Sequence, residues 1–416
     1  MTTPRSKRFQ LEWNLLVLVT TALVLFGLVM VYSATSGSAA LGNGNPQGYV
    51  EHQGAYALVG LVLLLVASRV GLEQIRRLAP TLVAAAFVLC LAVLAVGTPI
   101  NGARRWIAVG PLVFQPSELA KLGLVLWLAS HLSRRRPPGT LRELARPIGL
   151  VVGVFAVLVL VEPDLGTALT LLLVAGAILL VAGTRLPLLA SAYGIVIALT
   201  SIAAWTSPYR RDRLLTFLDP WQDPTGAGLQ NVQALISLGS GGIFGRGLGQ
   251  GIEPLHYLPE APTDMIFAVI GEELGLVGVA LVLMAFCAFG YAGFRLALGC
   301  RDPFAKRVAA GITALVCGQA AINIAAVLGV APLTGIPLPF VSYGGSSLVV
   351  MLTGVGVLLN IARGNGGRAA AAVPDRGRRD GRTRRAGAGR SRGAAAARGS
   401  GDLRRVAGSR RGAARS

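Results

Sequence analysis

Apolar runs of membrane-spanning length recur along almost the whole chain. A helix needs about 20 apolar residues to cross a bilayer, and runs near this length lie at 14–34, 53–69, 79–97, 116–133, 147–161, 165–182, 187–205, 264–294, 307–330 and 341–362. None alternates as a strand does, and in lipid helices satisfy their own backbone polar groups. With 53% hydrophobic and 14% charged residues, the chain is also too apolar for a soluble protein. The sequence predicts an all-α integral membrane protein of about ten transmembrane helices.

Basic residues alternate along the connections between these runs. Lys and Arg gather in the N-terminus, at 134–146, at 295–307 and in the C-terminal tail, whereas 35–52 and 331–340 contain none. By the positive-inside rule the basic set and both termini are cytoplasmic, and the other set faces the outside. The first run has no small-residue cleavage site at its end, so we interpret it as a retained signal anchor.

Two external loops contain arginines, although the positive-inside rule disfavours basic residues there. The arginines concerned are Arg104 and Arg105 in one loop and Arg210, Arg211, Arg213 and Arg246 in the other. An anionic ligand would explain them, and so would side chains that reach outer-leaflet headgroups. From charge alone both interpretations stay open.

Composition divides the chain into three parts. Residues 1–13 form a cytoplasmic N-terminus and 14–362 the membrane domain. Residues 363–416 are mostly Arg, Gly and Ala and supply most of the net charge of +20. Such a segment cannot form a core, so we predict a disordered cytoplasmic tail that touches anionic membrane lipids and not nucleic acid.

The longest external connection, 206–262, lies between the seventh and eighth runs. It contains LDPWQDP at 218–224 and the glycine-rich GSGGIFGRGLGQG at 239–251. Its aromatic, proline and apolar residues predict an ordered cap, since loops this long are usually functional or disordered. The glycine run lacks a following Gly-Lys-Ser/Thr and the G-x-G-x-x-G spacing, which excludes a nucleotide site. We interpret it as backbone held close to a ligand or to the bilayer.

Charged residues in two outer loops have structural and functional explanations. Glu118 and Lys121 share one helix face at i, i+3 spacing, after a proline that suits the first helical position. A buried pair that only holds the helix and a ligand-contacting role are equally open. Asp164, in EPDLGT at 162–167, is predicted to cap the helix that follows.

An acidic residue stands at the mouth of the eighth run. The segment 258–275 reads LPEAPTDMIFAVIGEELG, with Asp264 at the rim and Glu272 and Glu273 deeper in. Asp264 is either a helix cap, a role that Thr263 can also fill, or a catalytic carboxylate. At about 100° per residue Glu272 lies near the Asp264 face and Glu273 nearly opposite, so at most one shares its cavity.

These groups together predict an outward-facing site for a phosphorylated ligand. Arginine recognises phosphate or pyrophosphate with a planar fork, and a lone carboxylate can accept a proton from a hydroxyl nucleophile. GGSS at 344–347 is not a G-x-S-x-G elbow, so a serine hydrolase has no support. The four cysteines are scattered without metal-ligand spacing, and assistance by a divalent cation stays open.

Seven motifs, in order, resemble the SEDS family of cell-wall polymerases, to which FtsW and RodA belong. They are NGARRW, FQPSELAK, EPDLGTA, DPWQDPTGAG, GSGGIFGRGLGQG, LPEAPTDMIFAVIGEELG and GIPLPFVSYGGSS. The resemblance runs from the first span to Ile361 and leaves out the basic tail. DPWQDPTGAG and GLGQG look more like FtsW, whereas GIPLPFVSYGG is shared with RodA. Pro262 departs from the pattern, because many members have histidine there.

The resemblance implies a peptidoglycan glycosyltransferase that polymerises lipid II, the undecaprenyl-pyrophosphate-linked disaccharide pentapeptide, outside the bacterial cytoplasmic membrane. It implies Asp264 as the essential acid and brings Arg104, Arg105, Glu118 and Lys121 into a central cavity. Trp106, Ser342 and Tyr343 lie in its motifs without an assigned role. The implied partners are a class B penicillin-binding protein and, at the division septum, divisome proteins.

A mechanistic hypothesis combines the two lines of argument. Arg104 and Arg105, with Arg210, Arg211 or Arg213, would clamp the pyrophosphate of the donor lipid. Asp264 would deprotonate the sugar 4-hydroxyl of the acceptor, which attacks the anomeric carbon with inversion. The alternatives are an elongation-type RodA polymerase, a non-catalytic scaffold, and a lipid II flippase with Glu118, Lys121, Glu272 and Glu273 along its path.

Overall fold

A computed structural model describes residues 7–40, 46–100, 103–110, 112–205, 217–224, 226, 228–251 and 260–364. Arg210, Arg211 and Arg213 lie outside the described residues, as does the basic tail beyond Gly364. What the sequence predicts for them therefore stays a prediction.

Helices make up most of the described chain, as the apolar runs predict. After a short turn at Lys7–Phe9 they are α1 (Gln10–Ala40), α2 (Pro46–Ala67), α3 (Leu72–Val96), α4 (Pro116–Ser133), α5 (Leu141–Leu144), α6 (Leu150–Val161), α7 (Leu165–Ala182), α8 (Leu186–Trp205), α10 (Leu229–Ser240), α12 (Ile266–Gly299), α13 (Pro303–Val327) and α14 (Gly345–Ala362). A π-helical turn at Ala145–Gly149 joins α5 to α6. The long outer connection contains α10 and a 3-10 turn at Pro220–Gln222.

Eight helical stretches among the described residues are long and apolar enough to cross a membrane. Two of the ten predicted runs fall short of that standard. One is α4, an 18-residue helix with Glu118 and Lys121 in its first turns. The other is α8, whose apolar part is Leu186–Thr200. The chain is a multi-pass membrane protein, and the count of ten spans stays a prediction.

The outer connection between α3 and α4 forms a small antiparallel sheet that the sequence did not predict. Its three strands are β1 (Thr98–Ile100), β2 (Ala103–Val109) and β3 (Leu112–Phe114), in that order across the sheet. Two of the strands have only three residues. A period-2 pattern cannot be recognised over so short a stretch.

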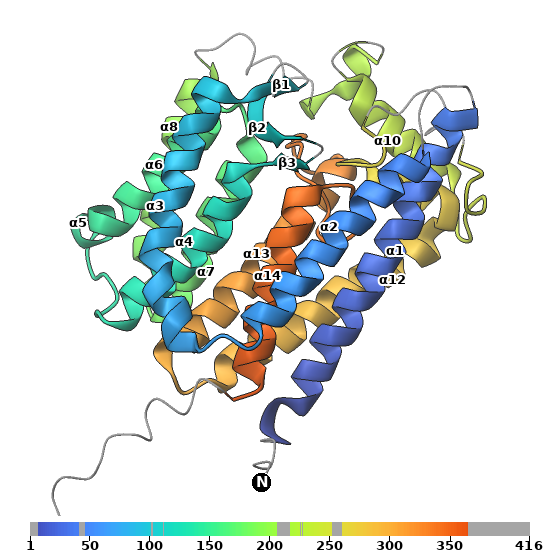
Figure 1. Cartoon of the computed structure of the whole chain (residues 1–416). Coiled ribbons are helices and arrows are strands. Elements are labelled where there is room, and N and C mark those ends of the chain that lie inside the picture. The colour runs from blue at the N-terminus through green and yellow to red at the C-terminus, as the bar shows by residue number, and fades with distance from the viewer. Residues whose placement is uncertain are drawn as a thin grey trace, which may run out of the picture. The chain divides into compact units, whose positions relative to one another are not determined.

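The helices α13 and α14 lie at the centre of the bundle and bury most of their side chains. Helices α4, α7 and α12 pack against α13, and α2 packs along α14 (Figure 1). Close approach in the last pair depends on small residues, since a Cβ at Gly356 would lie 2.4 Å from the Leu64 carbonyl oxygen. The glycine here is thus a packing requirement.

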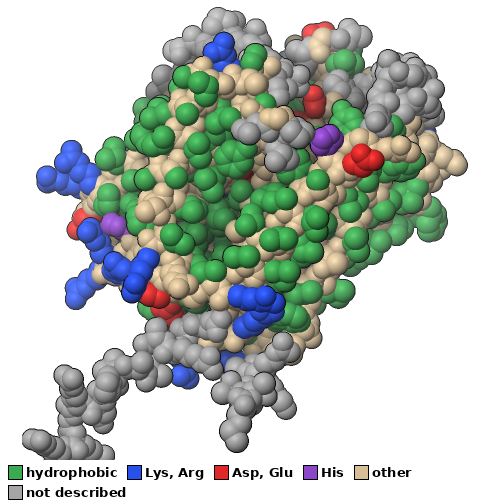
Figure 2. All heavy atoms as spheres, viewed as in Figure 1, with side chains coloured by type: hydrophobic (Ala, Val, Ile, Leu, Met, Phe, Trp, Pro, Cys, Tyr) green, Lys and Arg blue, Asp and Glu red, His purple; other side chains and the backbone are tan. Residues whose placement is uncertain are grey.

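The outer surface of the bundle is divided by polarity along its length. Hydrophobic side chains cover the flank in Figure 2, and most of the visible Lys and Arg side chains gather toward the end opposite the strands. The N-terminal helix α1 begins at that same end (Figure 1). By the positive-inside rule this distribution predicts that the basic end is cytoplasmic and that the end with the sheet and α10 faces outside, and the orientation stays a prediction.

Helix α12 is interrupted at Gly275, where the glycine-rich segment packs against it. Gly275 has φ 63° and ψ −160°, outside the helical region. The N–H of Leu276 donates to the Gly242 carbonyl at 2.9 Å, and the N–H of Gly247 donates to the Glu273 carbonyl at 2.9 Å. The segment thereby pairs main-chain groups that the break would otherwise leave unpaired inside a membrane helix.

Gly275→Ala is expected to lower the melting temperature and the yield of folded protein. A Cβ there would lie 2.4 Å from the Gly245 nitrogen and 2.6 Å from the Ile243 carbonyl oxygen. Gly110 has nearly the same φ, 62°, with nothing within 4 Å of its Cβ position. Gly110→Ala therefore adds only backbone strain, roughly 1–2 kcal/mol. Equal losses for the two variants in thermal melts would show that the close approach contributes nothing.

Candidate functional site

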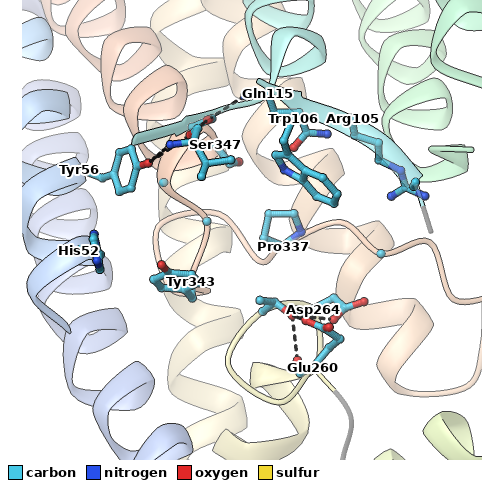
Figure 3. Close-up of a pocket in the computed structure, with 17 residues that line it drawn as sticks. His52, Tyr56, Arg105, Trp106, Gln115, Glu260, Asp264, Pro337, Tyr343 and Ser347 are labelled. Atoms are coloured by element: carbon cyan, nitrogen blue, oxygen red, sulfur yellow. Dashed lines mark hydrogen bonds between the residues drawn. The ribbon is translucent and has the colours of Figure 1, made fainter. Parts of the chain in front are cut away.

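A cavity of about 570 Å³ lies at the end of the bundle that carries the strands. Its walls come from five regions: α2, strand β2, strand β3 with the residue before α4, the turn before α12, and the connection from α13 to α14 together with the first turn of α14 (Figure 3). The charged and titratable side chains that line it are His52, Tyr56, Arg105, Glu260, Asp264 and Tyr343. Motifs that are far apart in the sequence therefore meet at one place.

Asp264 lines this cavity from the turn that precedes α12 (Figure 3). Burial, and to a smaller extent the charge of the nearby Glu260, raises the pKa of its carboxyl from 3.8 to about 6. The hydroxyl of Thr263, 3.0 Å from a carboxylate oxygen, and the charge of Arg105 act in the opposite direction. A carboxylate with a pKa near 6 is ionised at neutral pH and is a stronger base than an ordinary aspartate.

The capping interpretation of Asp264 and Thr263 is wrong. Helix α12 begins at Ile266, its N-cap is Met265, and no side chain makes a capping hydrogen bond there. The Thr263 hydroxyl points instead toward the carbonyl of Glu260, at 3.0 Å, within the same turn. Neither Thr263 nor Asp264 therefore caps α12.

Arg104 and Arg105 are neighbours on β2, and only one of them reaches the cavity. Arg105 lines the cavity, and its guanidinium donates to the main-chain carbonyls of Glu162, at 2.8 Å, and Pro163. Arg104 is exposed and is not among the lining residues. The resemblance brought both arginines into the cavity, and the strand geometry brings one.

The turn that holds Arg105 contains two acids with different surroundings. Asp164 caps α7 as predicted, since its carboxylate accepts a hydrogen bond from the Thr167 N–H at 2.9 Å. Glu162 is buried, and neither of its carboxyl oxygens has a hydrogen-bond partner among the described residues. Burial, then the charge of Asp164, raises the pKa of Glu162 to about 8, against the opposing effect of Arg105. At pH 7 Glu162 is therefore mostly neutral and does little to offset the charge of Arg105.

Glu118 and Lys121 form a buried ion pair in α4, with Nζ 2.7 Å from Oε1. Neither side chain lines the cavity. Lys121 also donates to Gln319 of α13 at 2.6 Å, and Gln319 in turn donates to the Pro337 carbonyl at 3.0 Å. Because Pro337 is a lining residue, the pair reaches the cavity through Gln319, whereas the resemblance placed it in the cavity directly.

Glu272 and Glu273, left unassigned by the sequence, attach the outer loop and α1 to α12. Glu272 accepts from the Ser237 hydroxyl at 2.9 Å and pairs with Arg246 at 3.5 Å. Glu273 accepts from the Ser33 hydroxyl of α1 at 2.6 Å. The pairing of Arg246 explains one of the external cations, and neither glutamate lines the cavity.

Three aromatic or hydroxyl residues of the motifs also have defined places. Trp106 lines the cavity, with its ring 6.0 Å from the Arg105 guanidinium carbon. Tyr343 lines the opposite wall and packs edge-on against Tyr49, with ring centroids 5.0 Å apart. Ser342 is buried, and its hydroxyl accepts from the Leu338 N–H at 2.8 Å, which stabilises the loop before α14.

Sequence reasoning missed several polar residues around the cavity. Tyr56 lines it from α2 and exchanges hydrogen bonds with the main chain of Val113 at 2.8 and 3.1 Å. Gln319 and Asn323 lie behind the cavity on α13 and bond to its loops. The signal was present for the last two, since amides at i, i+4 in an otherwise apolar helix are costly unless they have partners.

The cavity brings a carboxylate, a cation and aromatic side chains together. No group of three or more His, Cys, Asp or Glu that could hold a metal ion occurs in the described part of the chain. A partly buried carboxylate beside an arginine suits proton abstraction from a hydroxyl and the binding of a phosphorylated leaving group.

Known proteins similar to this chain share one family. Residues 13–366 match the FtsW/RodA/SpoVE cell cycle protein family. The probable peptidoglycan glycosyltransferase FtsW of Geobacter sp. strain M18 is 40% identical over 84% of this chain and 96% of its own. The stage V sporulation protein E of Bacillus subtilis is 38% identical over 84% and 96%.

Solved structures agree with this assignment. A chain of a peptidoglycan synthase complex that coordinates polymerisation and crosslinking has a TM-score of 0.72 and 33% identity, over 84% of this chain and 97% of that one. The rod shape determining protein RodA of Thermus thermophilus has a TM-score of 0.63 and 30% identity, over 86% and 98%. This chain therefore belongs to the FtsW/RodA/SpoVE family of cell cycle proteins.

Proposed function

We propose that this protein is a peptidoglycan glycosyltransferase that polymerises lipid II into glycan strands at the outer face of the bacterial cytoplasmic membrane. One observation carries the proposal: Asp264, with a pKa raised to about 6, and Arg105 line the same cavity. Relatives named as probable peptidoglycan glycosyltransferases support the reaction class.

In the proposed reaction Asp264 accepts the proton of the acceptor's sugar 4-hydroxyl as that oxygen attacks the anomeric carbon of the donor. A bond forms between the oxygen and the anomeric carbon, and the bond to the pyrophosphate breaks with inversion. Arg105 binds the departing pyrophosphate, whose negative charge grows in the transition state. No covalent glycosyl-enzyme is needed, because one carboxylate acts as base.

Among the described residues, Arg105 is the cation that is proposed to bind the pyrophosphate. Its guanidinium donates to two main-chain carbonyls, which fixes the side chain and leaves its charge for a ligand. Arg210, Arg211 and Arg213 remain proposed contributors, whereas Arg104 is exposed and does not line the cavity.

Septal synthesis during cell division is the proposed role, because FtsW-named relatives are about 38–40% identical. The proposed partners are divisome proteins and a class B penicillin-binding protein, which would crosslink the new strands. A structural neighbour from a complex that couples polymerisation to crosslinking supports such a pairing. An elongation role like that of RodA is the alternative.

Purified protein supplied with lipid II in detergent should produce glycan chains longer than the disaccharide, in particular with the crosslinking partner present. Product length on gels and the released undecaprenyl pyrophosphate measure the reaction. In detergent both faces of the protein are accessible, so a lipid II flippase would leave the substrate unchanged. Unchanged substrate, with and without the partner, would reject the polymerase.

A further inference from the structure

The connection between α13 and α14 forms one wall of the cavity, and its main-chain polar groups cannot all be paired by regular secondary structure. Pro337 and Pro339 lack N–H groups, and Phe340 has φ 66°, so the segment cannot join a regular ladder. Ile336 and Leu338 are nevertheless buried. Buried carbonyl groups in such a segment need side-chain partners.

Two amide side chains of α13 supply those partners. Asn323 donates to the carbonyl oxygens of Ile336 and Asp264, both at 2.8 Å. One turn earlier, Gln319 donates to the Pro337 carbonyl at 3.0 Å and lies 3.4 Å from the Ser347 hydroxyl. Both amides are buried, and together they hold two consecutive carbonyls of the connection.

The Asn323 contact joins the connection directly to the main chain of Asp264. The same two segments meet again where the Tyr343 N–H donates to the Pro262 carbonyl at 2.8 Å. Gly335, with φ 67°, brings the connection so close that a Cβ there would lie 3.9 Å from a carboxylate oxygen of Asp264. The carboxylate therefore stands on a turn whose position α13 determines.

The buried ion pair determines which way the Gln319 amide faces. Lys121 is a donor only, so it requires the Gln319 oxygen, which lies 2.6 Å from Nζ. The amide nitrogen must then face the connection and the cavity. Lys121, held by Glu118, thus acts on the cavity wall without lining it.

We propose that Asn323 and Gln319 are positioning residues, which fix the turn of Asp264 and the cavity wall beside it so that the carboxylate meets the acceptor hydroxyl. The inference rests on the proposed function, because it assigns Asp264 to proton transfer. A displacement of about 1 Å between reacting groups can cost on the order of 100-fold in rate.

The chain contains a matched control at the other end of the bundle. Asn360 of α14 is buried and donates to two main-chain carbonyls, those of Ala67 and Val70. Its Oδ1, like that of Asn323, has no hydrogen-bond partner among the described residues. Asn360 lies 15 residues after Gly345, which lines the cavity, hence about 22 Å along the helix.

The experiment compares Asn323→Leu with Asn360→Leu in the purified full-length protein. Both variants remove two hydrogen bonds from a buried amide to main-chain carbonyls, so both should lower the melting temperature by similar amounts. Only Asn323→Leu should lower kcat for lipid II polymerisation, by on the order of 100-fold per folded molecule, with KM changed by about twofold or less. A merely structural role would leave kcat per folded molecule unchanged in both.

Equal kcat values for Asn323→Leu and wild type, or equal losses in the two leucine variants, would overturn the inference. If Asn323→Leu does not fold, Gln319→Met replaces it, because methionine removes the donor to Pro337 while keeping a similar volume. If the wild type polymerises lipid II and Asp264→Asn does not, the proposed function is supported whatever the result for Asn323→Leu. A wild type without polymerase activity would overturn both proposals.

Discussion

Asp264→Asn is expected to abolish glycan polymerisation from lipid II while leaving the protein folded. Asparagine keeps the shape of the side chain and removes the proton acceptor, and a positioned base contributes about 10²–10⁴-fold to rate. Initial rates with purified protein measure the loss. Asp302→Asn is a matched control, because Asp302 caps α13 at the other end of the bundle and asparagine caps equally well. Polymerisation near the wild-type rate in Asp264→Asn would reject the assignment.

Because the pKa of Asp264 is raised in the folded protein, Asp264→Asn should stabilise the fold at neutral pH even though it abolishes activity. The folded protein holds the Asp264 proton more tightly, with a pKa of about 6 against 3.8. The protonated carboxyl therefore makes its full contribution to folding stability below pH 3.8, and this contribution is lost as the pH rises through about 6. Asp264→Asn avoids the buried charge, so its melting temperature at pH 7 should exceed that of wild type by a few degrees. The difference should vanish at low pH, and wild-type activity should fall below about pH 6.

Arg105→Ala is expected to lower kcat/KM for lipid II by about 10²–10³-fold, the effect of removing one preorganised group that stabilises developing charge. Arg104→Ala is the matched control, since Arg104 neighbours it on β2 and faces solvent. Arg104→Ala should stay within about twofold of wild type. Arg105→Lys should recover part of the loss, because lysine keeps the charge without the planar fork.

Initial rates over a range of lipid II concentrations distinguish these variants. Melting curves are needed beside them, because Arg105 also holds the carbonyls of Glu162 and Pro163. Equal losses in Arg104→Ala and Arg105→Ala would show that net charge at the outer end, and not a fixed clamp, supports the reaction.

The helices could be predicted from the sequence because each needs about 20 apolar residues, a strong signal in every window of the chain. The predicted run at 165–182 coincides with α7, and 116–133 coincides with α4. The Asp264 region was recognisable because a carboxylate at the mouth of an apolar run needs a reason. These features depend on residues that are close together in the sequence.

Contacts between distant segments could not be predicted in this way. The separation of Arg104 from Arg105 depends on a strand that the sequence did not predict, and the bond from Asn323 to Asp264 joins residues 59 apart. The role of Glu273 depends on Ser33, 240 residues away. A helical projection of one segment has no information about such partners.

The interruption of α12 limits how the long outer loop can change in evolution. A Cβ at Gly245 would lie 2.1 Å from the Glu273 carbonyl oxygen, and one at Gly275 would lie 2.4 Å from the Gly245 nitrogen. The atoms met in both cases belong to the main chain, which every amino acid shares. No second-site substitution can therefore make room for a side chain at either place. Glycine is therefore required at both positions, and also at Gly241 of the same segment, where a Cβ would meet the Gly271 carbonyl oxygen.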